Sequence, residues 1–136
     1  MIAKLKKAFL MVAGAAVQKY GMDLDSHQQL LTAAADMLIE IYIAESTLLR
    51  TEKLAKKQGE DKAKEQIAMA KLYLYKAVDI VTQKGKESII SFAEGDEQRM
   101  MLMGLRRFTK YTNMPNIVGL RETITAKLVA ENSYCF

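Results

Sequence analysis

The sequence predicts an all-α protein, an up-and-down helical bundle with two long central antiparallel helices and three shorter helices. Half of the 136 residues are hydrophobic, and the chain contains one proline and no tryptophan. Apolar residues recur every three or four positions through long segments, which is the spacing of one helix face. Few segments show the alternation of β-branched and polar residues that is typical of strands. A chain of this length suits one domain, so we expect residues 1–136 to form a single bundle.

The first helix is expected at residues 2–20. Its basic start, with Lys4, Lys6 and Lys7, precedes the apolar run AFLMVAGAAV, a pattern also shown by a secretory signal or by a helix in a membrane interface. The apolar face continues to Tyr20, beyond the point at which a signal would be cleaved, which favours a helix of the bundle. The run is too short to cross a bilayer, because crossing needs about 20 apolar residues.

The central helix is expected at residues 26–57. Ser26 and Gln29 have the spacing of a capping box, and Gly59 predicts the end of the helix. Apolar residues occupy three sides of it. They form a seam at Leu30, Ala34, Met37, Ile41, Ala44, Leu48 and Ala55, a second stripe at Leu31, Ala35, Leu38, Tyr42 and Leu49, and a third side at Ile39 and Ile43. We therefore expect residues 37–43 to be almost wholly buried.

The third helix is expected at residues 61–93, antiparallel to the central helix because a short turn joins the two. Gly85 inside it lowers helix propensity by about 1 kcal/mol relative to alanine, so we expect a close neighbour or a bend there. A fourth helix is expected at residues 97–111 and, after Pro115, a fifth at residues 116–132. The fifth helix should turn four residues inward: Ile117, Leu120, Ile124 and Leu128.

The fourth helix and the chain end offer a possible docking surface. Four of the nine methionines lie within fifteen positions of one another in this region. Flexible methionines fill irregular cores, and they also form soft surfaces that bind another domain or subunit. Bulky residues at a free chain end also suit docking onto a neighbour. The residues that we name for this surface are Met100, Met101, Met103, Tyr134 and Phe136.

The net charge of +4 is unevenly distributed. Residues 1–20 carry +4 and residues 99–136 carry +4, whereas residues 21–98 carry −4. Basic ends can attract phosphate or an anionic membrane, but so small a net charge on a mixed chain is typical of solvated surface. Bases and aromatics alternate between Arg106 and Tyr111, yet the bases also suit a helix C-terminus, so nucleic acid is not an expected partner.

The sequence contains no recognisable catalytic, cofactor-binding or metal-binding set. His27 is the only histidine and Cys135 the only cysteine, so the usual ligand sets of a di-iron bundle or a zinc site cannot be assembled. No glycine-rich phosphate loop is present. A single cysteine forms no internal disulfide, so nothing requires an oxidising compartment, and we expect a cytoplasmic location.

Three carboxylates stand out because they lie on the most apolar helix: Asp36, Glu40 and Glu45. Glu40 and Glu45 are five positions apart and therefore diverge, which does not suit a general acid and base pair. We expect a structural ion pair instead, in which a carboxylate is half-buried against a base of a packed neighbour. The candidate partners are Arg50, Lys71 and Lys76.

Four segments of the sequence share a family pattern: LKKAFLMVAGAAVQKYG (5–21), ADMLIEIYIAES followed by Arg50 (35–50), RRFTKYTNMPN (106–116) and AENSYCF (130–136). In their order, their spacing and the ending at Phe136, they resemble the C-terminal region of bacterial acyl-CoA dehydrogenases of the very-long-chain type. None of the four is a catalytic motif.

The resemblance implies that residues 1–136 are the C-terminal fragment of a longer enzyme of fatty-acid β-oxidation. In this family an N-terminal helical domain, a middle β domain and a helical bundle hold FAD and acyl-CoA. A glutamate removes the α proton while the flavin takes the β hydride. The additional C-terminal helical domain packs over this catalytic core and, in the longer members, fills space that another dimer fills in the shorter tetrameric ones. The family's membrane contact is attributed to a segment near the junction before this domain.

The resemblance therefore implies FAD in the parent enzyme and none bound by this chain. The implied partner is the catalytic core of the same polypeptide or a homo-oligomer partner. Neither the flavin-binding part nor the catalytic glutamate lies in these residues, so no active-site role carries over to Glu40 or Glu45. The alternative is a free-standing helical adaptor or a peripheral membrane-associated protein that uses the helix at residues 2–20.

Overall fold

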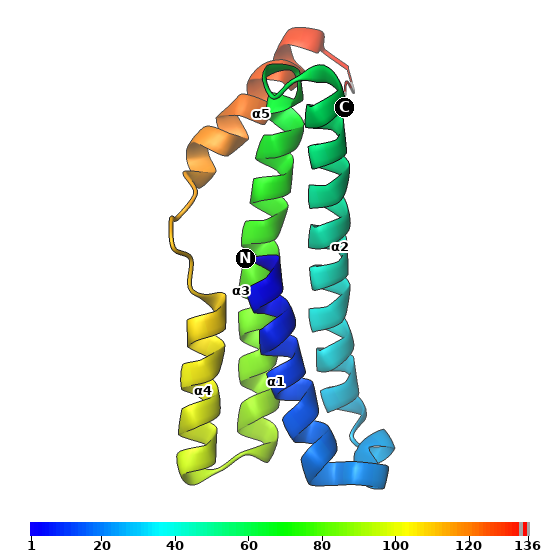
Figure 1. Cartoon of the computed structure of the whole chain (residues 1–136), viewed down its shortest axis with the longest axis vertical. Coiled ribbons are helices and arrows are strands. Elements are labelled where there is room, and N and C mark those ends of the chain that lie inside the picture. The colour runs from blue at the N-terminus through cyan, green and yellow to red at the C-terminus, as the bar shows by residue number, and fades with distance from the viewer. Residues whose placement is uncertain (134, 136) are drawn as a thin grey trace.

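The structure is a computed structural model that describes residues 1–133 and 135. Its elements follow one another as five α-helices and two short 3-10 helices (Figure 1). Their bounds are α1 Ile2–Tyr20, η1 Gly21–Ser26, α2 Gln28–Gln58, η2 Asp61–Ala63, α3 Lys64–Phe92, α4 Gly95–Thr109 and α5 Ile117–Glu131. No strand occurs in the described residues. The all-α prediction, with two long central helices and three shorter ones, is confirmed.

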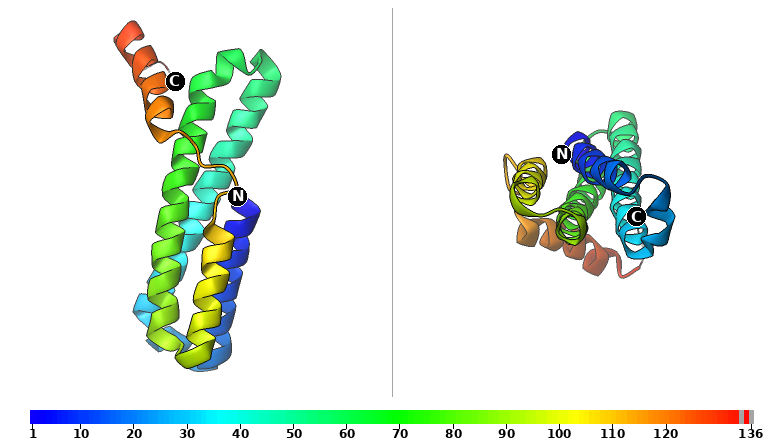
Figure 2. Two further views of the ribbon diagram at one scale, coloured as in Figure 1. Left: turned by 90° about the vertical axis from the view of Figure 1, so that its left-hand side faces the viewer. Right: turned by 90° about the horizontal axis from the view of Figure 1, so that it is seen from below.

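Helices α2 and α3 run antiparallel along the whole length of the bundle (Figure 1). Helices α1 and α4 pack beside the lower half of this pair, whereas α5 lies against the upper half (Figure 2). Of the described elements, α3 is the one that contacts α5. In its upper half, α2 therefore packs on α3 and, at its C-terminal end, on the short helix η2.

The core lies in the lower half, where α1, α2, α3 and α4 meet. The apolar face of α1 is buried there, which confirms α1 as a helix of the bundle. The largest fully buried side chains are Leu5, Val12, Met37, Ile41, Val81 and Ile89. Apolar surface removed from water stabilises a fold by roughly 25 cal/mol per Å², so these side chains hold α1, α2 and α3 together. Met101 and Leu105 add α4 to the same core.

Gly85 is a point of close helix approach, as its place inside a helix predicts. A β-carbon built there would lie 2.9 Å from Leu105 Cδ1 of α4 and 3.5 Å from Met37 Cε of α2. The absence of a side chain at Gly85 therefore makes room for both neighbours, and α3 contacts α2 and α4 at the same level.

The start of α2 differs from the predicted capping box. The N-cap residue is His27, without a side-chain capping bond, and the Ser26 hydroxyl donates to the Asp23 carbonyl at 2.7 Å within η1. The His27 ring packs on the Tyr20 ring with centroids 3.7 Å apart. The prediction of a capping box is therefore wrong, because the Ser26 hydroxyl is hydrogen-bonded to the backbone of the preceding 3-10 helix and not to the first turn of α2.

The expected burial of residues 37–43 is also wrong. Met37 and Ile41 are buried, but Leu38, Ile39 and Tyr42 are exposed. The cause is the position of α2 at the edge of the bundle, where none of the described helices lies on its outer side (Figure 1).

Helix α5 is only partly packed. Ile117, Leu120 and Ile124 are half-buried against α3, as expected, whereas Leu128 is exposed. No residue of α5 is classed as buried. Because α5 contacts a single helix, its apolar side chains are covered on one side only.

We predict that Gly85→Leu destabilises the bundle by about 1–3 kcal/mol, because the added side chain overpacks the space of Leu105 and Met37. Urea unfolding followed by circular dichroism measures the change. Gly14→Leu is the matched control, because a β-carbon at Gly14 meets nothing within 4 Å and the change gains helix propensity. Equal stability of the two variants would contradict the packing described here.

Candidate docking surface

The outer side of α2 presents a row of exposed apolar side chains. Leu38 is 50% exposed, Ile39 53%, Tyr42 70% and Leu49 59%. We call this surface the α2 outer face, made of Leu31, Ala35, Leu38, Ile39, Tyr42, Ile43 and Leu49. From Leu31 to Leu49 it extends about 27 Å along the helix axis. Single exposed apolar residues are common on proteins, but a continuous row of this length marks a binding surface.

The charged groups in the middle of α2 point toward neighbouring helices instead of outward. Glu45 Oε1 lies 2.6 Å from Lys6 Nζ of α1, and Asp36 Oδ2 lies 3.5 Å from Lys84 Nζ of α3. The Tyr73 hydroxyl donates to Glu40 Oε2 at 2.7 Å. Ser46 is the one polar residue exposed between Tyr42 and Leu49 on the outer side.

These contacts confirm that the carboxylates of α2 are structural, but the partners differ from the expected Arg50, Lys71 and Lys76. The true partners come from α1 and from other positions of α3, a long-range arrangement that helix spacing does not encode. The pairing of Glu45 with Lys6 also explains why a lysine stands at the edge of the apolar face of α1.

The Glu40 contact affects the acidity of Tyr73. The pKa of Tyr73 is raised to about 12, chiefly by burial and in addition by the hydrogen bond to Glu40 and the negative charge of Glu40. Tyr111 behaves similarly, since burial raises its pKa to about 12, with smaller contributions from Asp79 and Tyr75. Neither phenol is poised to exchange a proton near neutral pH, so neither suits acid or base catalysis.

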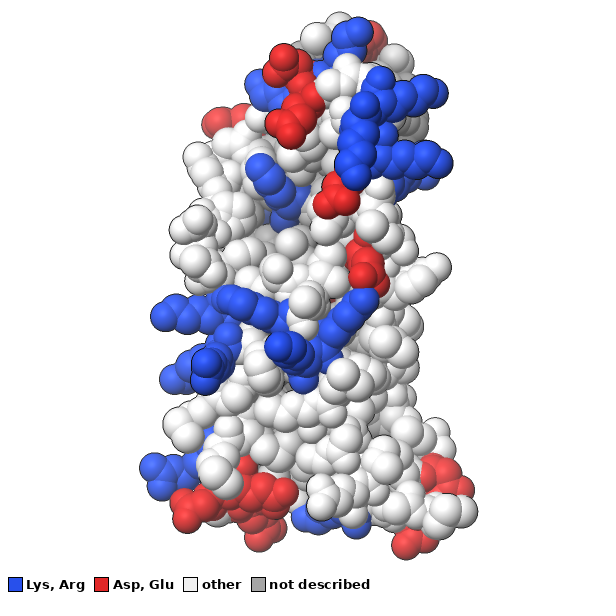
Figure 3. Space-filling view, viewed as in Figure 1, with Lys and Arg blue, Asp and Glu red and all other residues white. Residues whose placement is uncertain are grey.

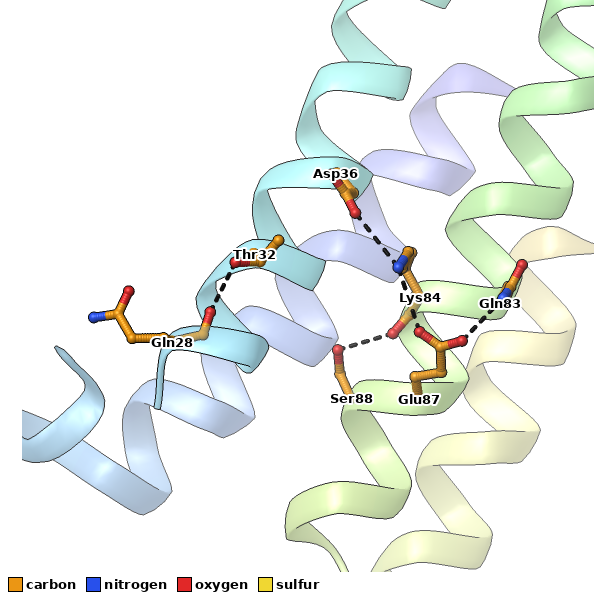
Figure 4. A network of polar contacts seen from close by, with 7 residues as sticks. All are labelled: Gln28, Thr32, Asp36, Gln83, Lys84, Glu87 and Ser88. Atoms are coloured by element: carbon orange, nitrogen blue, oxygen red, sulfur yellow. Dashed lines mark hydrogen bonds and ion pairs between the residues drawn. The ribbon is translucent and has the colours of Figure 1, made fainter. Parts of the chain in front are cut away.

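Lys84 joins α2 to α3 in the polar network of Figure 4. Its ammonium lies 3.5 Å from Asp36 and 3.5 Å from Glu87, and Gln83 Nε2 donates to Glu87 Oε1 at 2.9 Å. The hydrogen bond from Gln83 lowers the pKa of Glu87, and the charge of Lys84 acts in the same direction. The network is an exposed structural link between two helices.

The predicted methionine surface is divided by the structure. Met101 is 9% exposed and belongs to the core, whereas Met100 is 63% and Met103 65% exposed. Charged neighbours interrupt the exposed pair, including Asp96, whose carboxylate lies 3.5 Å from the Arg99 guanidinium. Tyr134 and Phe136 lie outside the described residues. A docking role for Met100 and Met103 stays a prediction.

The two basic segments of the sequence meet in space. Lys4 Nζ of α1 donates to the carbonyl of Lys110, which follows α4, at 3.4 Å. Figure 3 shows basic side chains in a band across the middle of this side of the molecule.

Across the part of the chain that the structure describes, no group of three or more His, Cys, Asp or Glu side chains could hold a metal ion. Within the same part, no helix is long and apolar enough to span a membrane.

Comparison with known protein families decides what this helical domain is. Residues 4–107 match the family described as acyl-CoA dehydrogenase, C-terminal domain. The match covers well over half of the chain.

The chain belongs to the acyl-CoA dehydrogenase C-terminal domain family.

Two relatives are consistent with this assignment. The chain is 37% identical over 131 residues to a probable acyl-CoA dehydrogenase of Bacillus subtilis (strain 168), covering 96% of this chain and 22% of the relative. It also resembles a crystal structure of an acyl-CoA dehydrogenase complexed with FAD from Bacillus anthracis, with a TM-score of 0.94 and 36% identity. That match covers 99% of this chain and 23% of the other. The chain thus spans about a fifth of the length of these relatives, as its resemblance to the family implied.

This acyl-CoA dehydrogenase domain exposes more surface than a compact monomer of its mass. Its accessible surface is 9238 Å², against about 7,100 Å² for a typical monomer of 15.3 kDa. The elongated bundle and the weakly packed α5 account for the difference. In a standard protein interface each partner buries roughly 800 Å². The extra accessible surface of this domain is larger than that, so it is sufficient for an interface of standard size.

Sequence reasoning did not identify the α2 outer face as exposed. The apolar stripe of this domain from Leu31 to Leu49 was recognised, but its burial was assigned to the bundle itself. Five helices of these lengths leave one side of α2 uncovered, so an outer stripe beside a complete inner seam indicates a second packing partner.

We predict that the free energy of unfolding of Tyr73→Phe falls less at alkaline pH than that of the unchanged chain. An unfolded tyrosine loses its proton near pH 10, whereas folded Tyr73 keeps it up to about pH 12, so the stability from this group is present below pH 10 and is lost as the pH rises toward 12. Urea unfolding at a series of alkaline pH values measures this dependence.

Glu40→Gln should lower the pKa of Tyr73 in an ultraviolet titration. An unchanged titration would show that Glu40 does not affect the phenol.

We predict that Glu45→Gln costs no more than about 1 kcal/mol of stability, because its ion pair with Lys6 lies on the surface. Thermal unfolding of Glu45→Gln, Lys6→Met and the double variant measures the coupling of the two charges. The coupling should shrink at high salt. A larger cost that persists at high salt would contradict the surface assignment.

Proposed function

We propose that this chain is a non-catalytic domain of a FAD-dependent acyl-CoA dehydrogenase of fatty-acid β-oxidation. In this proposal it packs on the catalytic core of the same polypeptide and shapes the assembly of subunits in the cytoplasm. The observation that carries the proposal is the similarity of nearly the whole chain to 23% of a FAD-complexed acyl-CoA dehydrogenase. An all-helical domain without a catalytic set suits a supporting role in such an enzyme.

The hollow beside α2 and α3 does not suit FAD. A hollow of about 700 Å³ beside α2 and α3 is wide open to solvent, and its lining includes the exposed bases Arg50 and Lys53. Cofactor sites enclose most of their ligand, so this groove does not suit a flavin. We therefore assign FAD to the remainder of the parent enzyme and derive no flavin chemistry from this chain.

The alternative of a free-standing adaptor or peripheral membrane protein has less support. That role needs the apolar face of α1 for a membrane, yet Leu5, Ala8 and Val12 of this face are buried in the bundle. Exposing them would remove α1 from the core. Lys6 and Lys7 are exposed on α1, but the large apolar side chains exposed beside them on this helix are Leu10 and Val17 alone, a small surface for membrane binding.

We predict that the purified 136-residue chain folds, is colourless and does not oxidise acyl-CoA. The longer polypeptide that carries this sequence should be yellow and should reduce an electron acceptor when acyl-CoA is added. Visible absorbance, circular dichroism and a dye-reduction assay measure these properties. A yellow, active preparation of the 136-residue chain would refute the proposal, and so would a longer polypeptide that is folded but free of flavin.

A further inference from the structure

We infer that the α2 outer face is the surface through which this domain packs on the preceding part of the same polypeptide. This inference rests on the proposed function and names the contact that it requires. The occupant is an uncharged, apolar surface of the remaining polypeptide. The relatives are more than four times as long as this chain, so most of each polypeptide lies outside the domain.

The chemistry of α2 supports this assignment. A helix on the surface of an isolated bundle normally directs charges outward and apolar residues inward. In α2 the middle of the outer side carries Leu38, Ile39 and Tyr42, while the nearby carboxylates contact α1 and α3. The outer face itself carries no charged side chain, so removing it from water costs less than burying a charged surface.

The inner side of α2 is already complete. Met37, Ile41 and Ala44 are buried against the other helices of this chain. The outer face is therefore not an unfilled part of the same core, since turning it inward would expose these three residues. A helix that is apolar on opposite sides requires a partner on each side, and the bundle supplies only one.

Competing surfaces are less suited to an apolar partner. Met100 and Met103 lie on α4 beside the ion pair of Asp96 and Arg99. Val118 and Val129 of α5 are exposed, but α5 is short and contacts a single helix of the domain. The α2 outer face is longer, uncharged and carried by a helix that is fixed in the core.

Residue-specific thiol labelling tests the inference. Cysteine is introduced singly at Leu38 or Tyr42, in a background in which Cys135 is replaced by serine. The matched control is Leu10→Cys, because Leu10 is an exposed leucine on α1, and Met103→Cys reports on the methionine surface. Labelling rates are compared between the 136-residue chain and the longer polypeptide that carries it, with the labelled peptides identified by mass spectrometry. Circular dichroism confirms that each variant keeps its helices.

We expect Leu38→Cys and Tyr42→Cys to react at least about tenfold more slowly in the longer polypeptide, because burial blocks access of the reagent to the thiol. Leu10→Cys should react at the same rate in both. Equal rates for Leu38→Cys and Tyr42→Cys in the two proteins would overturn the inference, whether or not Met103→Cys is protected. Protection in the 136-residue chain that grows with concentration, together with a dimeric mass, would also overturn it, because the occupant would then be a second copy.

The same samples separate failure of this inference from failure of the proposed function. A yellow, active polypeptide whose outer face stays reactive would reject the docking surface and leave the proposed function in place. A folded polypeptide without flavin or activity would reject the proposed function and, with it, the inference. As a second variant, Tyr42→Asp should lower the melting temperature of the longer polypeptide and leave that of the 136-residue chain nearly unchanged.

Discussion

The packing of α2 against α3 is the contact on which the rest of this domain depends. Met37 and Ile41 of α2 lie in the same core as Val78 and Val81 of α3, and Gly85 leaves room for α4 at the same level. Helix α1 then covers the lower half of the pair. Because α1 packs on both helices of this pair and α4 and α5 pack on α3, the bundle fixes the orientation of α2 and thereby which of its sides faces outward.

The outward side of α2 is the unusual consequence of this arrangement. The acidic side chains in the middle of α2 contact Lys6, Lys84 and Tyr73 of the neighbouring helices and so contribute to contacts between helices. The apolar side chains of α2 lie on two opposite sides of the helix. One side packs in the core and the other is exposed. The relatives of this chain are much longer polypeptides, and we propose that the outer side of α2 joins the bundle to the rest of such a polypeptide.

Periodicity predicted the elements of the fold well, because spacing of three and four depends only on neighbouring turns of one helix. It also located the close approach at Gly85, because glycine inside a helix is unfavourable without a packing reason. Periodicity could not show which apolar sides of α2 the bundle covers, so residues 37–43 were expected to be buried although Leu38, Ile39 and Tyr42 are exposed. The ion pairs of Asp36 and Glu45 were anticipated in kind but not in partner, since contacts between helices depend on their relative rotation. The docking residues Tyr134 and Phe136 lie outside the described residues, and their role stays a prediction.

Photo-cross-linking from position 42 tests the central claim most directly. A benzophenone amino acid replaces Tyr42 in the longer polypeptide, and mass spectrometry identifies the peptide to which it becomes joined after irradiation. The account predicts a peptide from the same polypeptide that lies outside these 136 residues. A cross-link only to a second copy of α2, or no cross-link in a folded and flavin-loaded enzyme, would contradict it.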